Sequence, residues 1–324
     1  MARNAQPETA VAVVGAGTIG IGWAVAQSRG GLAVALHDPD AEQLARALQE
    51  IAARLGDLEE FELLDEPAAT ILGRVRAQSD LGSALAGAVY VQECAPERLE
   101  LKRALLRTLD ELTPLRSILA SSSSAITASA MAAGLPGRAR CLVVHPGNPP
   151  YLLPVVELVP APFTDEDVVE RAFALLAGAG LSPVRVRVEL EGFVFNRLQG
   201  AMLREAYALV RDGVASVEDI DRIVTDGLGR RYSVVGPFET SDLNVRGGIS
   251  AHAERMGAAY GRMGDERGDH ARWTDELVAQ VDAERRALLP LERWSERVAW
   301  RDRALMRLAK ARREIEPFPP TLGE

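Results

Sequence analysis

A glycine-rich turn between a strand-like run and a helix-like run constrains the fold of this chain more than any other feature. The stretch VAVVGAGTIGIGWAVAQ places Gly15, Gly17 and Gly20 in a G-x-G-x-x-G pattern. In such a pattern the first glycine makes the tight turn, the second lets the backbone approach a pyrophosphate, and the third lets helix and strand pack closely. Thr18 and Ile19 supply backbone N–H groups in the first helical turn, where an anion is favoured. The pattern predicts a dinucleotide-binding site.

An acidic residue, Asp38, follows the next apolar run, about twenty residues after the glycines, where dinucleotide-binding folds place the partner of the adenosine ribose. Its carboxylate suits a ribose 2′-hydroxyl and would repel a 2′-phosphate, and no arginine lies between Asp38 and Arg46 to bind that phosphate. We therefore expect NAD rather than NADP as the cofactor. The alternative at this point is a plain strand–turn–helix that binds no cofactor.

Short β-branched runs alternate with helical patterns through the first 190 residues, which is typical of a parallel sheet with helices on its faces. From residue 192 onward the pattern is helical almost to the end. We predict an α/β fold, with a Rossmann-type, doubly wound, mostly parallel sheet in residues 1–190 and an all-helical domain in residues 191–324. Strands are expected at residues 11–14, 32–36, 88–92, 117–121, 140–145, 155–159 and 184–188.

Composition narrows the classes of partner. A formal net charge of −9 argues against nucleic acid or an anionic membrane as the main partner. No apolar run approaches the ~20 residues that cross a bilayer, and the first nine residues lack the apolar core of a signal peptide. Cys94 and Cys141 lie in apolar segments without metal-ligand spacing, so we expect reduced, buried thiols and no metal site. These features predict a cytoplasmic protein.

The stretch VVHPGNPPYLLPVVELVP, residues 143–160, holds the first candidates for chemistry. Glu157 lies inside a β-branched run, where a charge is costly unless another group pairs with it, and His145 is the nearest candidate partner. A histidine with an ordinary pKa of about 6.5 suits the general base that takes a hydroxyl proton while a hydride leaves carbon. A buried carboxylate fixes the tautomer of such a histidine. The alternative is a strand-end histidine bonded to a turn carbonyl.

Four segments, QECAPERLELK, ASSSSA, HPGNPPYLLPVVELV and GFVFNRLQ, resemble the L-3-hydroxyacyl-CoA dehydrogenase family in their order and spacing. The nearer likeness is to its branch that contains λ-crystallin (L-gulonate 3-dehydrogenase) and carnitine 3-dehydrogenase. The resemblance runs from about residue 10 to the carboxyl end, where WRDRALMRLAK is similar to the λ-crystallin tail. It implies an NAD-dependent oxidoreductase that acts on a CH–OH group, in a family associated with fatty acid metabolism.

The resemblance also implies roles for individual side chains. It assigns the catalytic pair to His145 and Glu157. Ser124, the last serine of SSSS, matches the active-site serine, whose hydroxyl would bind the reacting oxygen of the substrate or the nicotinamide side. Asn196 in GFVFNR matches an amide that donates to the substrate oxygen. The structural alternative for Asn196 is a cap-like role at the start of a helix.

Three more matched positions concern the nicotinamide half of the cofactor. Asn148, three residues after the histidine, matches a position that contacts nicotinamide, and Glu97 and Lys102 match positions that line the nicotinamide ribose. An exposed ion pair within one helix is the alternative for Glu97 and Lys102. Because Lys102 is one of only two lysines in the chain, we favour the functional interpretation.

Two departures from the acyl-CoA enzymes bear on the substrate. Their S-N-T-S motif is SSSS here, and residues 55–70, LGDLEEFELLDEPAAT, are strongly acidic where those enzymes carry a lysine-rich helical insertion for the coenzyme A phosphates. An acidic segment should repel such phosphates. Arg231 in GLGRRYSVVGP matches an arginine of the λ-crystallin and carnitine branches and suits bidentate recognition of a free carboxylate. Arg230 is its rival, and a surface ion pair is the alternative for either.

These observations predict oxidation of the 3-hydroxyl of a small, L-gulonate-like L-3-hydroxy acid to the 3-keto acid. The runner-up is an L-3-hydroxyacyl-CoA dehydrogenase that acts on a thioester such as 3-hydroxybutyryl-CoA. An alternative of another class is a non-catalytic, NAD-binding, crystallin-like structural protein. Apolar residues at helical spacing in residues 274–289 and 292–315, together with the dimers of related enzymes, predict a homodimer through the helical domain.

Overall fold

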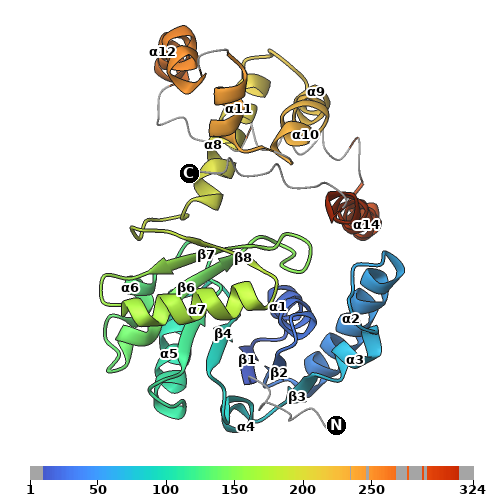
Figure 1. The fold of residues 1–324 in the computed structure, drawn as a ribbon, viewed down its shortest axis with the longest axis vertical. Helices are drawn as coiled ribbons and strands as arrows, with labels where there is room; N and C mark the ends of the chain where they lie inside the picture. The colour runs from blue at the N-terminus through green and yellow to red at the C-terminus, as the bar shows by residue number, and fades with distance from the viewer. Residues whose placement is uncertain are drawn as a thin grey trace, which may run out of the picture. The chain divides into compact units, whose positions relative to one another are not determined.

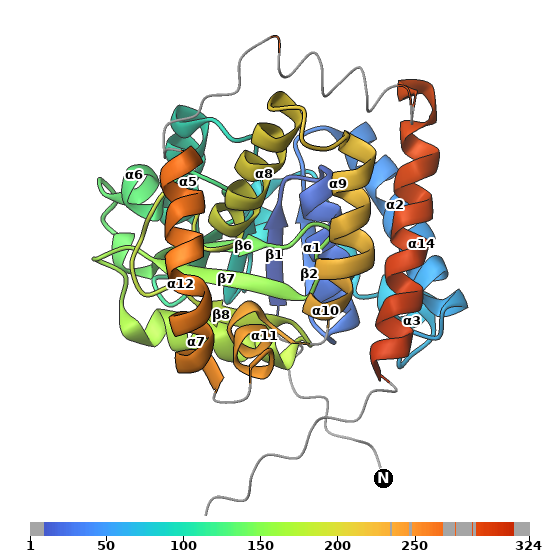
Figure 2. The same cartoon turned by 90° about the horizontal axis from the view of Figure 1, so that it is seen from above.

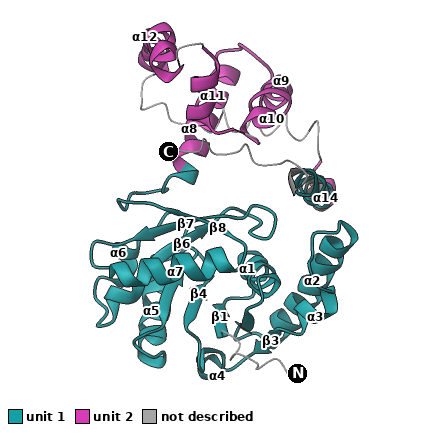
Figure 3. Cartoon of the chain, viewed as in Figure 1, with its two compact units in different colours: residues 1–196, 299–324 teal, residues 197–298 magenta. Residues whose placement is uncertain are grey.

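The computed structural model describes residues 10–233, 235–245, 248–267, 276, 287 and 290–313 (Figure 1). The chain divides into two compact units. The first comprises residues 1–196 and 299–324, and the second comprises residues 197–298 (Figure 3). The expected helices at residues 274–289 lie outside the described residues apart from two isolated positions.

The first unit is built on an eight-stranded sheet with the strand order β3-β2-β1-β4-β5-β6-β7-β8. Neighbouring strands run parallel, except that β6 and β7 pair antiparallel. This order reverses between β1 and β4, as expected for a doubly wound sheet, so the predicted fold class is confirmed. The strands are β1 (Ala10–Val14), β2 (Ala33–His37), β3 (Val75–Gln78), β4 (Tyr90–Glu93), β5 (Ile118–Ser121), β6 (Cys141–Pro146), β7 (Val155–Pro160) and β8 (Ser182–Arg185).

Helices cover both faces of this sheet, because successive side chains of a strand point to opposite faces. Val11 and Val13 of β1 belong to the apolar cluster that contains α1, α2 and α7, whereas Ala12 and Val14 belong to the cluster that contains α4, α5 and α6. The helices of the first unit before residue 190 are α1 (Thr18–Arg29), α2 (Ala41–Glu60), α3 (Ala68–Leu72), α4 (Leu81–Leu85), α5 (Leu99–Leu112), α6 (Ala128–Ala132) and α7 (Glu166–Gly178).

Two edge strands differ from the sequence-based prediction. We did not predict β3, whose four residues pair only with β2 and bury only Val75. We expected a strand at residues 184–188, but β8 spans residues 182–185 because it pairs only with residues 155–158 of β7. An edge strand is fixed by one neighbour, so its own apolar pattern is a weak guide to its bounds.

The second unit is helical throughout its described residues. The expected division at residue 190 lies six residues before the observed one, and the expected helical domain 191–324 differs at its end because residues 299–324 belong to the first unit. The helices from residue 195 on are α8 (Phe195–Arg211), α9 (Val217–Ile223), a π-helical turn (Val224–Leu228), α10 (Gly229–Tyr232), α11 (Pro237–Leu243), α12 (Gly248–Arg267) and α14 (Trp294–Arg313).

The last part of α14 joins the first unit through packing and charge. Met306 and Asp302 are buried, and the Arg303 guanidinium forms ion pairs with Asp57 and Glu60 at the end of α2. Figures 1 and 2 show α14 next to α2. The assignment of this segment therefore follows from contacts between residues more than 240 positions apart, which no local pattern reveals.

A Gly20→Ala substitution should destabilise the first unit, because a Cβ atom there would lie 1.8 Å from the Gly15 carbonyl oxygen. Backbone must shift to relieve this overlap, so we expect the free energy of unfolding to fall by about 3 kcal/mol, the upper end for overpacking. The measurement is urea unfolding followed by circular dichroism. Gly17→Ala is the matched control, since its Cβ atom would meet no heavy atom within 4 Å. Equal stability of the two variants would contradict this packing argument.

Candidate functional site

A pocket of about 910 Å³ opens in the first unit at the carboxyl ends of the parallel strands. Ligands of doubly wound sheets bind at this edge, at the point where the strand order reverses. The pocket is bordered by residues that follow β1, β2, β4, β5 and β6. Among the predicted site residues, those that line it are Gly15, Gly17, Thr18, Ile19, Asp38, Glu97, Lys102, Ser124, His145 and Asn148.

The glycine turn after β1 has the geometry of a pyrophosphate cradle. Gly15 has a φ of +108°, which side-chain-bearing residues rarely adopt, and its N–H donates to the His37 carbonyl at 2.8 Å. A Cβ atom on Gly17 would meet no heavy atom within 4 Å, so the space beside it is open. Helix α1 begins at Thr18 with no side-chain cap and no acidic residue in its first turn. Its free N–H groups therefore favour an anion, and the residues fit a bound dinucleotide.

Asp38 borders the pocket beyond the end of β2 and also holds the glycine turn. Its Oδ2 atom accepts a hydrogen bond from the Ala16 N–H at 2.9 Å. Gln43 of α2 donates from Nε2 to the Ala16 carbonyl at 2.7 Å, so the Ala16 peptide is held on both sides. The sequence analysis did not single out Gln43 or His37, although both line the pocket. Both residues lie more than fifteen positions after the glycine motif in the sequence. Only the pairing of β2 with β1 brings them next to that motif.

The antiparallel pairing of β6 and β7 sets His145 directly opposite Glu157. His145 Nδ1 lies 2.8 Å from Glu157 Oε2. The other carboxylate oxygen, Oε1, accepts the backbone N–H groups of Val194 and Phe195 at 2.8 and 2.9 Å, where α8 begins. The carboxylate in the apolar run is thus fully paired, which removes the cost of burying it.

The charge of Glu157 decides the tautomer of the histidine. Burial raises the pKa of the Glu157 carboxyl, but hydrogen bonds from His145 and from the N–H groups of Phe195 and Val194 outweigh it and hold the pKa below its usual range. An anionic carboxylate only accepts, so Nδ1 of His145 donates and Nε2 is left as the basic atom. Phe193 and Phe195 place their ring centroids 5.6 and 6.1 Å from that of the imidazole, and His145 as a whole is 7% exposed.

Ser124 and Asn196 contact each other. The Asn196 amide donates from Nδ2 to the Ser124 carbonyl at 2.9 Å. Within the described part of the chain the Ser124 hydroxyl has no hydrogen-bond partner, and Ser124 borders the pocket. The amide of Asn196 therefore retains its oxygen and one N–H for another partner.

Asn148 is exposed at the pocket edge and precedes a cis peptide bond to Pro149.

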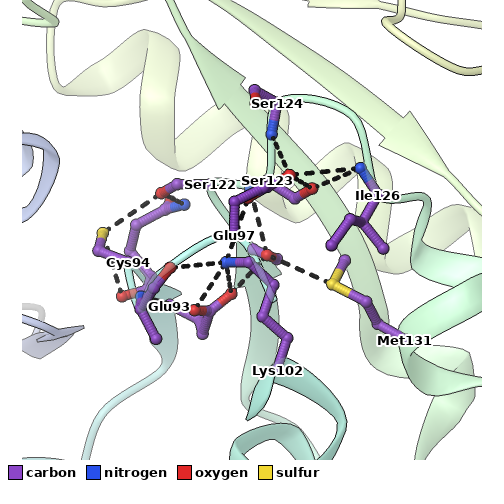
Figure 4. A network of polar contacts seen from close by, with 12 residues as sticks. Glu93, Cys94, Glu97, Lys102, Ser122, Ser123, Ser124, Ile126 and Met131 are labelled. Atoms are coloured by element: carbon purple, nitrogen blue, oxygen red, sulfur yellow. Dashed lines mark hydrogen bonds and ion pairs between the residues drawn. The ribbon is translucent and has the colours of Figure 1, made fainter. Parts of the chain in front are cut away.

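Glu97 binds the serine turn that follows β5 (Figure 4). Its Oε1 atom accepts the Ser123 hydroxyl at 2.6 Å and the N–H groups of Ser124, Ala125 and Ile126 at 3.1 to 3.4 Å. Although burial raises the pKa of the Glu97 carboxyl, the Ser123 hydroxyl, the Ala125 N–H and the nearby Lys102 hold it below its usual range. The exposed pair within one helix, our alternative for Glu97 and Lys102, is wrong, because Lys102 is buried.

Lys102 forms a buried ion pair that the sequence analysis missed. Its Nζ atom contacts both carboxylate oxygens of Glu93, at 2.9 and 3.0 Å, and lies 3.7 Å from Glu97 Oε2. Glu93 ends β4 in the apolar run VYVQECA, so the argument that singled out Glu157 applied equally to it. The signal was therefore present in the sequence.

Ser122 joins a second set of buried polar groups at the pocket. Its hydroxyl oxygen accepts the Trp23 indole N–H at 3.0 Å and the Gln92 amide at 2.7 Å, and lies 3.3 Å from Cys94 Sγ. Burial raises the pKa of the Cys94 thiol to about 12, so it is protonated at neutral pH. A protonated thiol is a poor nucleophile, which leaves Cys94 a packing role beside the pocket.

Arg231 lies on α10 of the second unit, with its guanidinium 5.8 Å from the Tyr232 ring centroid. Arg230, its rival, forms an ion pair with Asp226 at 3.2 Å. Arg231 makes no ion pair with any residue the structure describes. Of the two arginines, Arg230 is therefore the one that is paired within the described residues.

The acidic segment 55–70 is less repulsive than the sequence suggested. Asp57 and Glu60 pair with Arg303, Glu62 with Lys310, and Glu66 with Arg74. Four of its six carboxylates are thus paired, three of them with α14, which reduces the negative charge of the segment. Within the described ranges, no three His, Cys, Asp or Glu side chains group as a metal site would require. None of the described helices combines the length and apolar character of a bilayer crossing.

The sequence matches two family models in succession. Residues 10–189 match the NAD binding domain of 3-hydroxyacyl-CoA dehydrogenase, and residues 192–288 match its C-terminal domain. Lambda-crystallin from Oryctolagus cuniculus is 38% identical over 311 residues, which cover 95% of this chain and 97% of that protein. A 3-hydroxyacyl-CoA dehydrogenase from Gibberella moniliformis is 36% identical over 320 residues, covering 97% and 98% of the two chains.

Solved structures agree with these matches. The structure of 5-formyl-3-hydroxy-2-methylpyridine 4-carboxylic acid 5-dehydrogenase, an NAD⁺-dependent dismutase, superposes with a TM-score of 0.80 at 27% identity, covering 95% of this chain and 98% of that one. The resemblance stated from the four sequence segments and the prediction of NAD are therefore confirmed. This chain belongs to the 3-hydroxyacyl-CoA dehydrogenase family and is an NAD-dependent oxidoreductase that acts on a CH–OH group.

Proposed function

We propose that this enzyme oxidises the 3-hydroxyl of a small L-3-hydroxy acid, with His145 as the general base and Glu157 as the group that orients it. The observation that carries the proposal is the 2.8 Å contact between His145 Nδ1 and Glu157 Oε2, beside a pocket that also contains the glycine turn. A base with a fixed tautomer at a dinucleotide pocket suits the loss of a hydroxyl proton together with a hydride.

NAD would lie along the pocket, with its pyrophosphate at Gly17 and the first turn of α1 and its adenosine ribose at Asp38. Bound NAD supplies the hydride acceptor. Glu97 and Asn148 would contact the nicotinamide half, since both line the pocket and match the family positions expected to do so. The proton transfer and the binding of the substrate oxygen would be carried out by the side chains of the protein.

The free Nε2 atom of His145 would take the proton of the substrate hydroxyl. The imidazolium that forms is stabilised by Glu157, whose carboxylate stays anionic because its pKa is held low. The Ser124 hydroxyl and the second N–H of the Asn196 amide would hold the reacting oxygen, because the pair is already joined through the Ser124 carbonyl. Phe193 and Phe195 limit the access of water to the imidazole.

A free carboxylate on the substrate is favoured by two observations. Arg231 makes no ion pair with the described residues, and a guanidinium binds carboxylates in a bidentate manner. The structurally similar dismutase acts on a compound that carries a carboxylic acid. Charge repulsion by residues 55–70 is reduced, because Asp57, Glu60 and Glu62 pair with α14 and Glu66 pairs with Arg74.

An L-3-hydroxyacyl-CoA remains the second candidate, and the relative from Gibberella moniliformis is the observation that favours it. The two candidates share the same proton and hydride chemistry. They differ in whether the 3-hydroxyacyl group ends in a free carboxylate or in a thioester with a nucleotide tail. The site around His145 does not distinguish them, so substrate recognition has to.

We expect NADH oxidation with small 3-keto acids to exceed that with acetoacetyl-CoA at least ~10-fold in kcat/KM, because a bidentate arginine–carboxylate contact contributes on that scale. The measurement is absorbance at fixed enzyme concentration over a panel of 3-keto acids and acetoacetyl-CoA. Arg231→Met should remove this preference, whereas Arg230→Met should keep it. A preference for the thioester in the unmodified enzyme would favour the second candidate.

A His145→Ala variant should bind NADH normally and lose kcat by roughly 10²-fold or more, the scale of removing a general base. Glu157→Gln should also lower kcat, because a neutral amide no longer enforces the tautomer. Both are measured by steady-state kinetics together with NADH titration. His252→Ala, in the second unit, is the matched histidine control and should retain activity. Unchanged turnover in His145→Ala would remove the histidine from the mechanism.

The apolar surface of the second unit supports the proposal of a homodimer. In its described part only Ala208, Val210, Val217 and Thr240 are buried, whereas Phe238 and Leu243 of α11 are 80% and 69% exposed. Exposed apolar surface of this kind is typical of an interface, and a second copy of the chain is the simplest partner.

The two free cysteines support a reducing, cytoplasmic location.

We expect light scattering after size exclusion to give twice the mass of one chain, and Phe238→Glu to shift the protein towards the monomer, because a buried unpaired charge opposes association. Leu115→Glu is the matched control, since Leu115 is 82% exposed but lies in the first unit. A wild-type protein of single-chain mass at micromolar concentration would refute the dimer.

A further inference from the structure

Two buried charges beside the pocket, Glu93 and Lys102, have no part in the proton and hydride transfer described above. Their side chains are 0% and 1% exposed, and Lys102 Nζ lies 2.9 Å from the nearer oxygen of Glu93. Burying such a pair costs much of the free energy that its attraction returns, so a hydrophobic pair of similar volume is often as stable. Stability alone is therefore a weak reason for these two residues.

The ammonium of Lys102 has no proton left for a cofactor. A lysine ammonium has three N–H donors. Here Nζ contacts both oxygens of Glu93 and the Ala95 carbonyl oxygen, each at 3.0 Å or less, while Glu97 Oε2 lies beyond hydrogen-bonding distance at 3.7 Å. Lys102 therefore reaches the pocket wall with its donors already used.

The carboxylate of Glu93 links the two loops that border the nicotinamide end of the pocket. Its Oε1 atom accepts the Ala95 N–H at 2.6 Å in the loop after β4. Its Oε2 atom accepts the Ser121 hydroxyl at 2.5 Å, and that hydroxyl oxygen in turn accepts the Ser123 N–H at 3.2 Å in the loop after β5. Figure 4 shows Glu93 and Lys102 between the two loops.

These loops carry the groups that face the cofactor and substrate in the proposed function. Glu97 lies two residues after Ala95, and Ser124 follows Ser123. Glu97 Oε1 is held by the serine turn, whereas Oε2 lies 3.7 Å from Lys102 Nζ, and the residue lines the pocket. A shift of either loop would thus displace Glu97 and Ser124 together.

We propose that Glu93 and Lys102 are a positioning pair, which sets Glu97 and Ser124 for the nicotinamide half of NAD without contacting it. The proposal rests on the proposed function only in placing that half of NAD at this end of the pocket. It differs from the role that we first expected for Lys102, a direct contact with the nicotinamide ribose. The two roles predict different results when the pair is replaced as a unit.

The test compares Lys102→Met with the double variant Glu93→Gln and Lys102→Met. The single variant leaves a buried carboxylate without its cation, so the loops must rearrange. In the double variant the glutamine oxygen still accepts the Ala95 N–H and its amide donates to Ser121, while the Ala95 carbonyl at the pocket wall is left to water. NADH and ADP titrations by calorimetry report the whole cofactor and its adenosine half, and neither needs a substrate.

We expect Lys102→Met to weaken NADH binding at least ~10-fold, the scale of a lost hydrogen bond to a charged group, and to leave ADP binding unchanged. The double variant should bind NADH within about 3-fold of the unmodified enzyme. Where the single variant does not fold, the double variant decides alone. Lys310→Met, which alters the other lysine at an exposed ion pair with Glu62, is the matched control and should bind both ligands normally.

Three results would overturn the proposal. A double variant as weak for NADH as Lys102→Met would mean that the ammonium itself contacts the cofactor. Normal NADH binding by Lys102→Met would mean that the pair does not set the site. Parallel losses of NADH and ADP binding would reduce the pair to a general structural role. None of these results depends on which hydroxy acid is the substrate, so failure of the proposed function remains a separate finding.

Discussion

The hydrogen bond between His145 and Glu157 is the interaction on which the rest of the site depends. Antiparallel pairing of β6 with β7 sets the two residues opposite each other, so the sheet itself fixes their separation. The same carboxylate accepts two backbone N–H groups at the start of α8. One anion therefore orients the imidazole and fixes where the chain leaves the sheet, which brings Asn196 to Ser124.

The protein solves the problem of a buried carboxylate in two ways. Glu157 is paired with an imidazole that can take a proton, and its charge stays available to stabilise the imidazolium. Glu93 is paired with the Lys102 ammonium and also accepts hydrogen bonds from the Ala95 N–H and the Ser121 hydroxyl. Glu93 ends β4, whereas Glu157 lies inside β7, opposite His145. The first arrangement suits proton transfer, and the second suits the positioning of loops.

Sequence reasoning was strongest where function rests on local geometry and weakest where it rests on distant partners. Gly15, Gly17 and Asp38 were predicted because a strand, a turn and a helix place them without help from the remaining chain. Gln43 was missed because only tertiary folding brings α2 to the glycine turn. The role that we first gave to Lys102 did not include its hydrogen bonds to Glu93, nine residues earlier. Those bonds form because α5 packs against the end of β4 in the folded chain.

The sequence by itself determined the doubly wound sheet, the NAD-binding turn and the candidate pair His145 and Glu157, because each follows from short-range periodicity or from the cost of an isolated buried charge. Only the tertiary structure decided which partner each charge takes. The sequence suggested that residues 55–62 form a repulsive acidic surface. In the structure Arg303 and Lys310 of α14 pair with carboxylates of this segment. Such pairings join segments far apart in the chain, and a sequence specifies the charges but not the distances between them.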